Sequence, residues 1–178
     1  MEIRRVVTGV DGRGKSVFLS DGPAPHSHDC AALPGQAQTC IWYTAAVPTT
    51  VPPEGEPTTA RGRVVAPPGG DSFVIVRFAP DSLTTTEDFD GQRLHAEFGE
   101  FASDIAASSD PDNPGMHRTQ SLDYGVILDG EVWLELDDGA QTRLTRSDTI
   151  VQIAARHAWH NKSDAPATAA FLLTGAEA

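Results

Sequence analysis

Two stretches toward the C-terminal end of the chain decide its fold: residues 116–139, MHRTQSLDYGVILDGEVWLELDDG, and residues 142–175, TRLTRSDTIVQIAARHAWHNKSDAPATAAFLLTG. In the first stretch Val132, Leu134 and Leu136 occupy every second position. Apolar residues at this period are typical of a strand that buries one face. The pattern therefore predicts a strand at the end of the first stretch.

The pair Asp129-Gly130 separates this strand, residues 131–136, from an apolar run at residues 122–128. Asp-Gly favours the tight turn of a β-hairpin, because Gly readily adopts the positive φ that such a turn needs. We therefore expect the two segments to pair as a hairpin.

Residues 12–15, Gly-Arg-Gly-Lys, only partly match a phosphate-binding loop. They are therefore also predicted to form a hairpin turn.

Short runs of strand-forming residues recur along the rest of the chain, each bounded by Gly, Pro, Asp or Asn. The eight runs are 3–8, 16–19, 41–46, 73–78, 122–128, 131–136, 149–153 and 169–174. Many short strands separated by turn residues are typical of antiparallel sandwiches and barrels. The predicted fold class is therefore all-β.

Three segments depart from this pattern. Residues 91–107 carry one apolar stripe at helical spacing and are predicted to form a single helix. Residues 47–70 are too rich in Pro, Gly and Thr for a regular ladder, and are interpreted as a long loop that is either a connector or a lid over a pocket. Residues 26–29, His-Ser-His-Asp, are interpreted as a solvated turn and not as a metal site. The stripe consists of Leu94, Phe98, Phe101 and Ile105.

Length and composition bound the class of protein. The chain has 178 residues, of which 39% are apolar and 21% charged, so we expect one domain with one core. In this division residues 1–110 provide N-terminal strands, the Pro-rich loop and the helix, and residues 111–175 provide the core motifs. Cys30 and Cys40 are predicted to be free thiols.

The net charge of −12 disfavours partners of the same sign. Phosphate backbones and anionic membranes are repelled by such a surface, so neither nucleic acid nor membrane is an expected partner. The sequence shows neither an apolar leader segment nor the roughly 20 consecutive apolar residues of a membrane-spanning helix. A cytoplasmic location is the resulting expectation.

Polar side chains that share strand parity are the candidates for chemistry. Residues two apart on a strand face the same side, so the two rows would converge on one surface and line a cavity. Tyr124 and His160 should point the opposite way. The rows are His117, Thr119, Ser121 and Asp123 in the first stretch, and His157, Trp159 and Asn161 in the second.

These rows resemble the two motifs of the cupin family, which are small antiparallel β-barrels of the jelly-roll type. The first motif is H-x-H-x-x-x-E followed by six residues and Gly, and its places are taken by His117, Thr119, Asp123 and Gly130. The second ends P-x-G-x-x-H-x-x-x-N, and its places are taken by Gln152, Ala154, His157 and Asn161. Ser147-Asp148 stands where cupins usually have a Gly-Asp turn. The resemblance implies a cupin barrel with an N-terminal strand extension and one short helix.

Cupins commonly hold one divalent ion on three His and one Glu, and carried over residue by residue this implies His117, Asp123 and His157 as ligands. Two imidazoles and a carboxylate would suit Fe(II), Mn(II), Ni(II) or Zn(II). The alternative is that no metal binds: Thr119 is a poor replacement for an imidazole, and the polar groups hydrogen-bond one another or a ligand.

The resemblance implies a small-molecule enzyme, in which His117, Asp123 and His157 are catalytic. A lyase, an isomerase or cyclase, and a dioxygenase are all open, on a small organic substrate that is aromatic or polyketide-like. The alternative is a non-catalytic binding or sensing barrel. The residues expected to contact substrate are Thr119, Ser121, Gln152 and Trp159. A homodimer is expected, in which N-terminal strands or the helix cover an apolar outer face of the partner.

Overall fold

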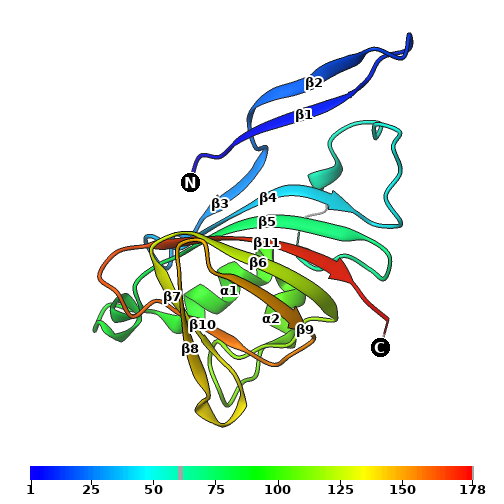
Figure 1. The fold of residues 1–178 in the computed structure, drawn as a ribbon. Helices are drawn as coiled ribbons and strands as arrows, with labels where there is room; N and C mark the ends of the chain where they lie inside the picture. The colour runs from blue at the N-terminus through cyan, green and yellow to red at the C-terminus, as the bar shows by residue number, and fades with distance from the viewer. Residues whose placement is uncertain (60–61, 178) are drawn as a thin grey trace.

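The computed structural model describes residues 1–59 and 62–177 and is built mainly of antiparallel strands (Figure 1). Each of the eight predicted runs overlaps a strand, so the all-β prediction is confirmed. The strands are β1 (Arg4–Val10), β2 (Ser16–Pro23), β3 (His26–Asp29), β4 (Ala37–Thr44), β5 (Asp71–Phe78), β6 (Ser121–Asp129), β7 (Glu131–Glu135), β8 (Gln141–Thr145), β9 (Thr149–Ile153), β10 (Ala158–His160) and β11 (Ala167–Gly175).

Two sheets form the body of the molecule, and a third stands apart from it. The larger sheet has the order β3-β4-β5-β11-β6-β9, the smaller has the order β10-β7-β8, and β1 pairs only with β2. The main core lies between the two sheets, where Ile127, Val132 and Phe171 pack together. Strands from both ends of the chain therefore share one sheet and one core.

The predicted hairpin of residues 122–128 and 131–136 is wrong. Both edges of β6 are occupied by β11 and β9, and β7 pairs with β8 and β10. Gly130 has φ +72°, as predicted, but a Cβ there would lie 2.9 Å from the Cα of Ala167. The Asp-Gly turn therefore carries the chain from one sheet to the other. The hairpin that does form joins β7 to β8 through η3 (Asp137–Gly139).

Residues 26–29 form strand β3 and not the predicted solvated turn. Ser27 Oγ lies 2.8 Å from Thr39 Oγ1 on β4, and His28 Nε2 lies 2.7 Å from Glu97 Oε1. The ring of His28 also stacks on Phe101 at 4.1 Å between centroids. These partners are distant in sequence, which is why the local pattern did not indicate a strand.

The predicted single helix is two helices, α1 (Gly91–Phe101) and α2 (Ser103–Ser108), with a break at Ala102. Asp90 caps α1 by accepting hydrogen bonds from the first backbone N–H groups. The carboxylate of Asp104 accepts from the N–H groups of Val64 and Val65, and so holds α2 against the preceding loop. Two further short helices are η1 (Pro57–Thr59) and η2 (Asp81–Thr85).

The apolar stripe of the helices faces the body of the protein. Phe98, Phe101 and Ile105 pack against the main core, and Leu94 packs against a small second cluster around Leu33. Figure 1 shows both helices beside the sheets, on the side away from the N-terminal arm. The helices therefore close this protein's own core.

Within residues 47–70, Val64 lies in the main core and lines the cavity described below. The interpretation of this loop as a lid stays a prediction.

Cys30 and Cys40 are free thiols, as predicted, and burial raises the pKa of Cys40 to about 11. Among the helices formed by the described residues, none is long and apolar enough to span a membrane.

Candidate functional site

A cavity of about 850 Å³ opens between the larger sheet, β10 and the helical segment. Its volume lies in the range of small-molecule sites, about 300–1,000 Å³. Most of the wall is apolar and much of it is aromatic, and it includes the polar residues His117, Thr119, Asp123, Gln152 and His157 of the two motifs. The aromatic wall consists of Phe78, Phe89, Phe98, Trp159 and Phe171.

The structure brings His117 and His157 together, as the two motifs predict. Their backbones form an isolated antiparallel bridge, with two N–H···O bonds of 2.9 Å between the same two residues. Their ring centroids are 4.3 Å apart. A pairing of main chains thus places two imidazoles side by side in the wall of the cavity.

The hydrogen bonds of the two rings fix which nitrogen carries the proton. Nδ1 of His117 lies 3.0 Å from the carbonyl oxygen of Gly115, and Nδ1 of His157 lies 2.9 Å from that of Ala155. A carbonyl oxygen can only accept, so Nδ1 of each ring donates. In the neutral rings Nε2 is therefore the nitrogen with the free lone pair, which can accept a proton.

The predicted row on β6 faces inward. Thr119, Ser121 and Asp123 are all buried, and Tyr124 is exposed on the other face, as strand parity requires. Thr119 Oγ1 donates to Asp123 Oδ2 at 3.3 Å. Within this row Thr119 and Asp123 therefore contact each other inside the barrel.

Gln152 connects the carboxylate to the imidazole pair. Its amide nitrogen donates to Asp123 Oδ2 at 3.4 Å and lies 3.0 Å from Nε2 of His157. The nitrogen also lies 2.9 Å from Nδ1 of the same ring, but Nδ1 already donates to Ala155. The bond to His157 is therefore the one to Nε2. Among the described residues no hydrogen bond is made to Nε2 of His117, which leaves that nitrogen open to the cavity.

Burial sets the charges of the site. It lowers the pKa of His157 to about 4, assisted by the neighbouring His117, and it also lowers the pKa of His117. Both imidazoles are therefore held in the neutral form near pH 7. Burial raises the pKa of Asp123, against the opposing effect of nearby hydroxyl and amide donors.

Three buried oxygens of the site have no hydrogen-bond partner among the described residues: Ser121 Oγ, Asp123 Oδ1 and Gln152 Oε1. Buried polar atoms without partners are uncommon, because each costs about 1–3 kcal/mol. All three belong to neighbouring strands, β6 and β9, which pair at Asp123 and Gln152. Asp123 and Gln152 line the cavity and Ser121 does not, so Asp123 Oδ1 and Gln152 Oε1 are the places where a hydrogen-bond donor of a ligand would be held.

The arrangement does not fit a divalent ion on His117, Asp123 and His157. In the part of the chain that the structure describes, no group of three or more His, Cys, Asp or Glu side chains is placed to hold a metal. The amide of Gln152 contacts both Asp123 and His157, so an N–H donor lies where the two predicted ligands would share an ion. Thr119, at the place of a motif histidine, is engaged with Asp123.

The remaining residues of the second motif divide between the cavity and the scaffold. Trp159 packs against Phe171 at 5.3 Å and meets the edge of His157 at 6.1 Å between centroids, in the cavity wall. A contact between Trp159 and substrate stays a prediction. His160, which strand parity predicted to point away, is also a lining residue of the cavity, and its ring contacts the carboxylates of Asp81 and Glu135.

Asn161 is a structural residue. Its amide nitrogen donates to the carbonyl oxygens of Phe78 and Ala165, and its Oδ1 accepts from the N–H and hydroxyl of Ser163. The side chain is almost completely buried. It ties the turn before β11 to the end of β5, and so supports the strand that carries Trp159.

Two departures from the cupin motifs lie at backbone positions that favour glycine. Ser147 has φ +74° and Ala154 has φ +44°, where the family usually has Gly. The left-handed conformation explains why glycine suits these turns. The backbone of the motif is thus retained without its glycines.

Sequence reasoning missed the aromatic part of the cavity wall. Phe78 and Phe171 lie on strands that were predicted, and Phe98 belongs to the predicted helical stripe. Parity with buried neighbours could have indicated that Phe171 faces inward, since Ala169 and Leu173 share its face. Nothing local indicated that strand and helix would enclose one cavity.

Comparison with known proteins agrees with this reading of the fold. No family model matches the chain. The chain is 54% identical over 48 residues to phomopsin biosynthesis cluster protein C' of Diaporthe leptostromiformis, which covers 27% of this chain and 25% of the relative. It is 28% identical over 157 residues to the cupin-domain-containing oxidoreductase fogC of Aspergillus ruber, covering 88% of this chain and 63% of the relative.

The matched segment is thus a quarter of the phomopsin protein, and less than two thirds of fogC. Among solved structures, a cupin domain from Bordetella pertussis is 17% identical and covers 60% of this chain and 82% of its own, with a TM-score of 0.37. The chain is therefore similar in sequence to cupin-domain proteins, and its antiparallel strands, with the two motifs meeting in the cavity, are consistent with a cupin-type barrel fold.

Proposed function

We propose that this chain is an enzyme that binds a planar, largely apolar organic molecule in the cavity and transfers a proton on it with His117. The observation that carries the proposal is the pair of neutral imidazoles at the polar side of an aromatic cavity, with Nε2 of His117 unengaged. A neutral imidazole close to a substrate is an effective general base near pH 7.

The aromatic lining of the cavity supports a planar, largely apolar substrate. Five aromatic side chains line the cavity and would pack against the faces of a planar ring system. The net charge of −12 disfavours a polyanionic ligand. The name of the phomopsin relative refers to a biosynthetic cluster, which is consistent with a natural product of similar chemistry.

The polar groups have separate roles in the proposal. Nε2 of His117 takes a proton from a carbon next to a carbonyl group of the substrate, and can return it to another atom of the same substrate. Asp123 orients Gln152 and Thr119 by accepting their hydrogen bonds. Isomerases, lyases and cyclases share such a proton transfer.

The test uses 2-tetralone, a planar aromatic ketone with exchangeable α-hydrogens, in deuterated buffer. Protein that abstracts the α-proton will speed deuterium incorporation, followed by NMR. His117→Gln should lower the rate by about 10²–10⁴-fold, the usual contribution of a general base. His26→Gln is the matched control, because His26 lies outside the cavity and its loss should leave the rate unchanged.

Binding is measured separately, from the change in tryptophan fluorescence when 2-tetralone is added. Binding without accelerated exchange in the wild-type protein would refute the enzyme and favour the non-catalytic barrel. An exchange rate that is equal in wild type and His117→Gln would remove His117 from the mechanism.

Metal analysis of protein purified without chelator tests whether His117, Asp123 and His157 hold an ion. One divalent ion per chain, lost in His157→Gln, would contradict the conclusion that these residues do not fit a metal.

A further inference from the structure

The polar end of the cavity, defined as His117, Thr119, Asp123, Gln152 and His157, has used all of its own hydrogen-bond donors. Each imidazole donates its Nδ1–H to a backbone carbonyl, and the hydroxyl of Thr119 donates to Asp123. The two amide N–H groups of Gln152 go to Asp123 Oδ2 and His157 Nε2. An ionised carboxylate has no donor. These five side chains therefore offer a ligand no free N–H or O–H.

Three acceptor atoms of the polar end remain free among the described residues. They are Nε2 of His117, Oδ1 of Asp123 and Oε1 of Gln152. Asp123 and Gln152 are each 6% exposed and lie opposite each other on paired strands, so their free oxygens belong to adjacent side chains. Ser121 lowers the pKa of the Asp123 carboxyl, but its hydroxyl makes no hydrogen bond. A ligand at the polar end must therefore supply donors.

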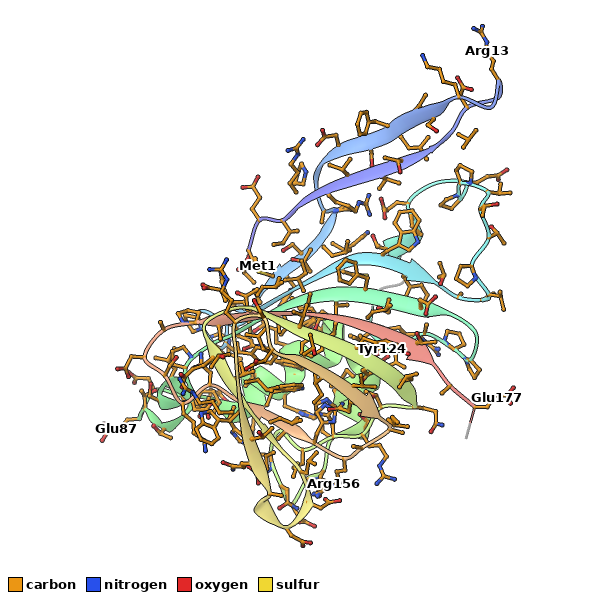
Figure 2. The ribbon with its side chains drawn as sticks, viewed as in Figure 1. Met1, Arg13, Glu87, Tyr124, Arg156 and Glu177 are labelled. Atoms are coloured by element: carbon orange, nitrogen blue, oxygen red, sulfur yellow. The ribbon has the colours of Figure 1, made fainter. Side chains whose placement is uncertain are left out.

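The carboxylate of Asp123 gives the polar end a negative charge, since both imidazoles are neutral near pH 7. Among the described residues that line the cavity, none is Lys or Arg. The other two lining carboxylates already have partners. Asp110 pairs with Arg156, which Figure 2 labels on the side of the molecule away from β1 and β2, and Asp81 accepts from the backbone N–H of Asn161. Asp123 is thus the lining carboxylate that can receive a cation.

A primary ammonium group fits these acceptors better than other common donor groups. It carries three N–H donors and no acceptor, as the Lys side chain does. A hydroxyl or an amide would also bring an oxygen that accepts, and the polar end has no donor for it. A guanidinium carries five N–H groups, which is more than three acceptors can satisfy. Hydrogen bonds between charged partners are also roughly twice as strong as those between neutral groups.

The aromatic wall favours a cation in the same place. Trp159 lies beside the polar end, with its ring centroid 6.1 Å from that of His157, and it packs on Phe171. A cation placed over an aromatic ring is attracted to it, most strongly to Trp. Burial raises the pKa of Asp123, and a bound cation would oppose this rise by stabilising the carboxylate. Charge and ring packing therefore favour the same kind of ligand.

We infer that the ligand of this cavity is a primary alkyl amine that carries an aromatic ring, bound as the ammonium between Asp123 Oδ1 and Gln152 Oε1. The ring packs against the aromatic wall. Nε2 of His117, the third free acceptor, stays available for the proton transfer proposed above. The inference rests on the proposed function for the use of the cavity as a ligand site, whereas the ammonium position requires no reaction.

The test compares ligands that share one ring system and differ in their polar group, by isothermal titration calorimetry at pH 7 with EDTA present. At this pH 2-aminotetralin is a cation, 2-tetralol is neutral and tetralin-2-carboxylate is an anion. Wild type should bind 2-aminotetralin about 10–100-fold more tightly than 2-tetralol, the gain expected from a hydrogen bond to a charged group. The carboxylate should bind most weakly. An amine that does not bind, or binds no more tightly than the alcohol, would overturn the inference.

Asp123→Asn tests which residue holds the ammonium. The Asn oxygen can still accept from Thr119 and Gln152, and its NH₂ group then replaces the free acceptor with a donor. The preference for 2-aminotetralin over 2-tetralol should fall about 10–100-fold. Asp112→Asn is the matched control, because it changes the net charge equally, but Asp112 is exposed and outside the cavity. Its preference should equal that of wild type.

A folded Asp123→Asn variant, judged by a melting temperature near that of wild type, that keeps the full preference would also overturn the inference. If this variant melts far below wild type, the ligand series on wild type decides alone. Failure here is distinguishable from failure of the proposed function. Amine preference without deuterium exchange in 2-tetralone would refute the proton transfer and retain the ammonium site, whereas exchange without amine preference would do the reverse.

Discussion

Acid should destabilise this protein through His157. The folded protein holds the pKa of His157 at about 4, whereas the unfolded chain protonates near the ordinary value of 6.5. Between these values the unfolded state binds more protons, so the free energy of unfolding falls as the pH falls. The full difference corresponds to about 3 kcal/mol, and about 2 kcal/mol of it is lost between pH 7 and pH 5.

The assay is urea denaturation at pH 7, 6 and 5, with EDTA present, for wild type and His157→Gln. Glutamine does not titrate, so the variant should lose about 2 kcal/mol less than wild type over this range, whatever its stability at pH 7. His117 contributes a further loss in both proteins, because burial lowers its pKa too. Equal slopes for wild type and variant would refute the reasoning that burial keeps His157 neutral.

Two further predictions concern the scaffold. Asn161→Ala should lower the free energy of unfolding by about 3 kcal/mol, because it leaves two carbonyl groups and a turn without their partner; a loss under 1 kcal/mol in urea titration would contradict that role. Gly130→Ala should lower the free energy of unfolding by about 1–3 kcal/mol more than Gly139→Ala does. Both glycines have φ near +70°, so the backbone strain of the two substitutions is similar. The difference is that a Cβ at Gly130 contacts Ala167, whereas a Cβ at Gly139 has no atom within 4 Å. Equal thermal melting of these two variants would show that the contact with Ala167 does not matter.

The sequence alone predicted which residues share a face and which two segments form the site. Strand parity is a local property of the backbone, so the inward row from Thr119 to Asp123 and the outward Tyr124 could be read directly from alternation. The spacing of the two cupin motifs predicted that His117 and His157 would meet, and the isolated bridge between them confirms it.

The sequence did not predict partners that lie far along the chain. An Asp-Gly turn has the same backbone whether the next strand folds back or crosses to another sheet, and only the occupied edges of β6 exclude the hairpin. The stripe from Leu94 to Ile105 has helical spacing throughout, but the helix breaks at Ala102 while Asp104 bonds to the loop at Val64 and Val65.

The chemistry of the site was likewise decided by tertiary contacts. The motif positions alone allowed His117, Asp123 and His157 to be read as metal ligands, whereas the amide of Gln152 between two of them does not fit an ion. Residue type and period are properties of short segments, and they are sufficient to specify strands and faces. Which donor reaches which acceptor depends on how whole sheets pack, and this only the folded chain determines.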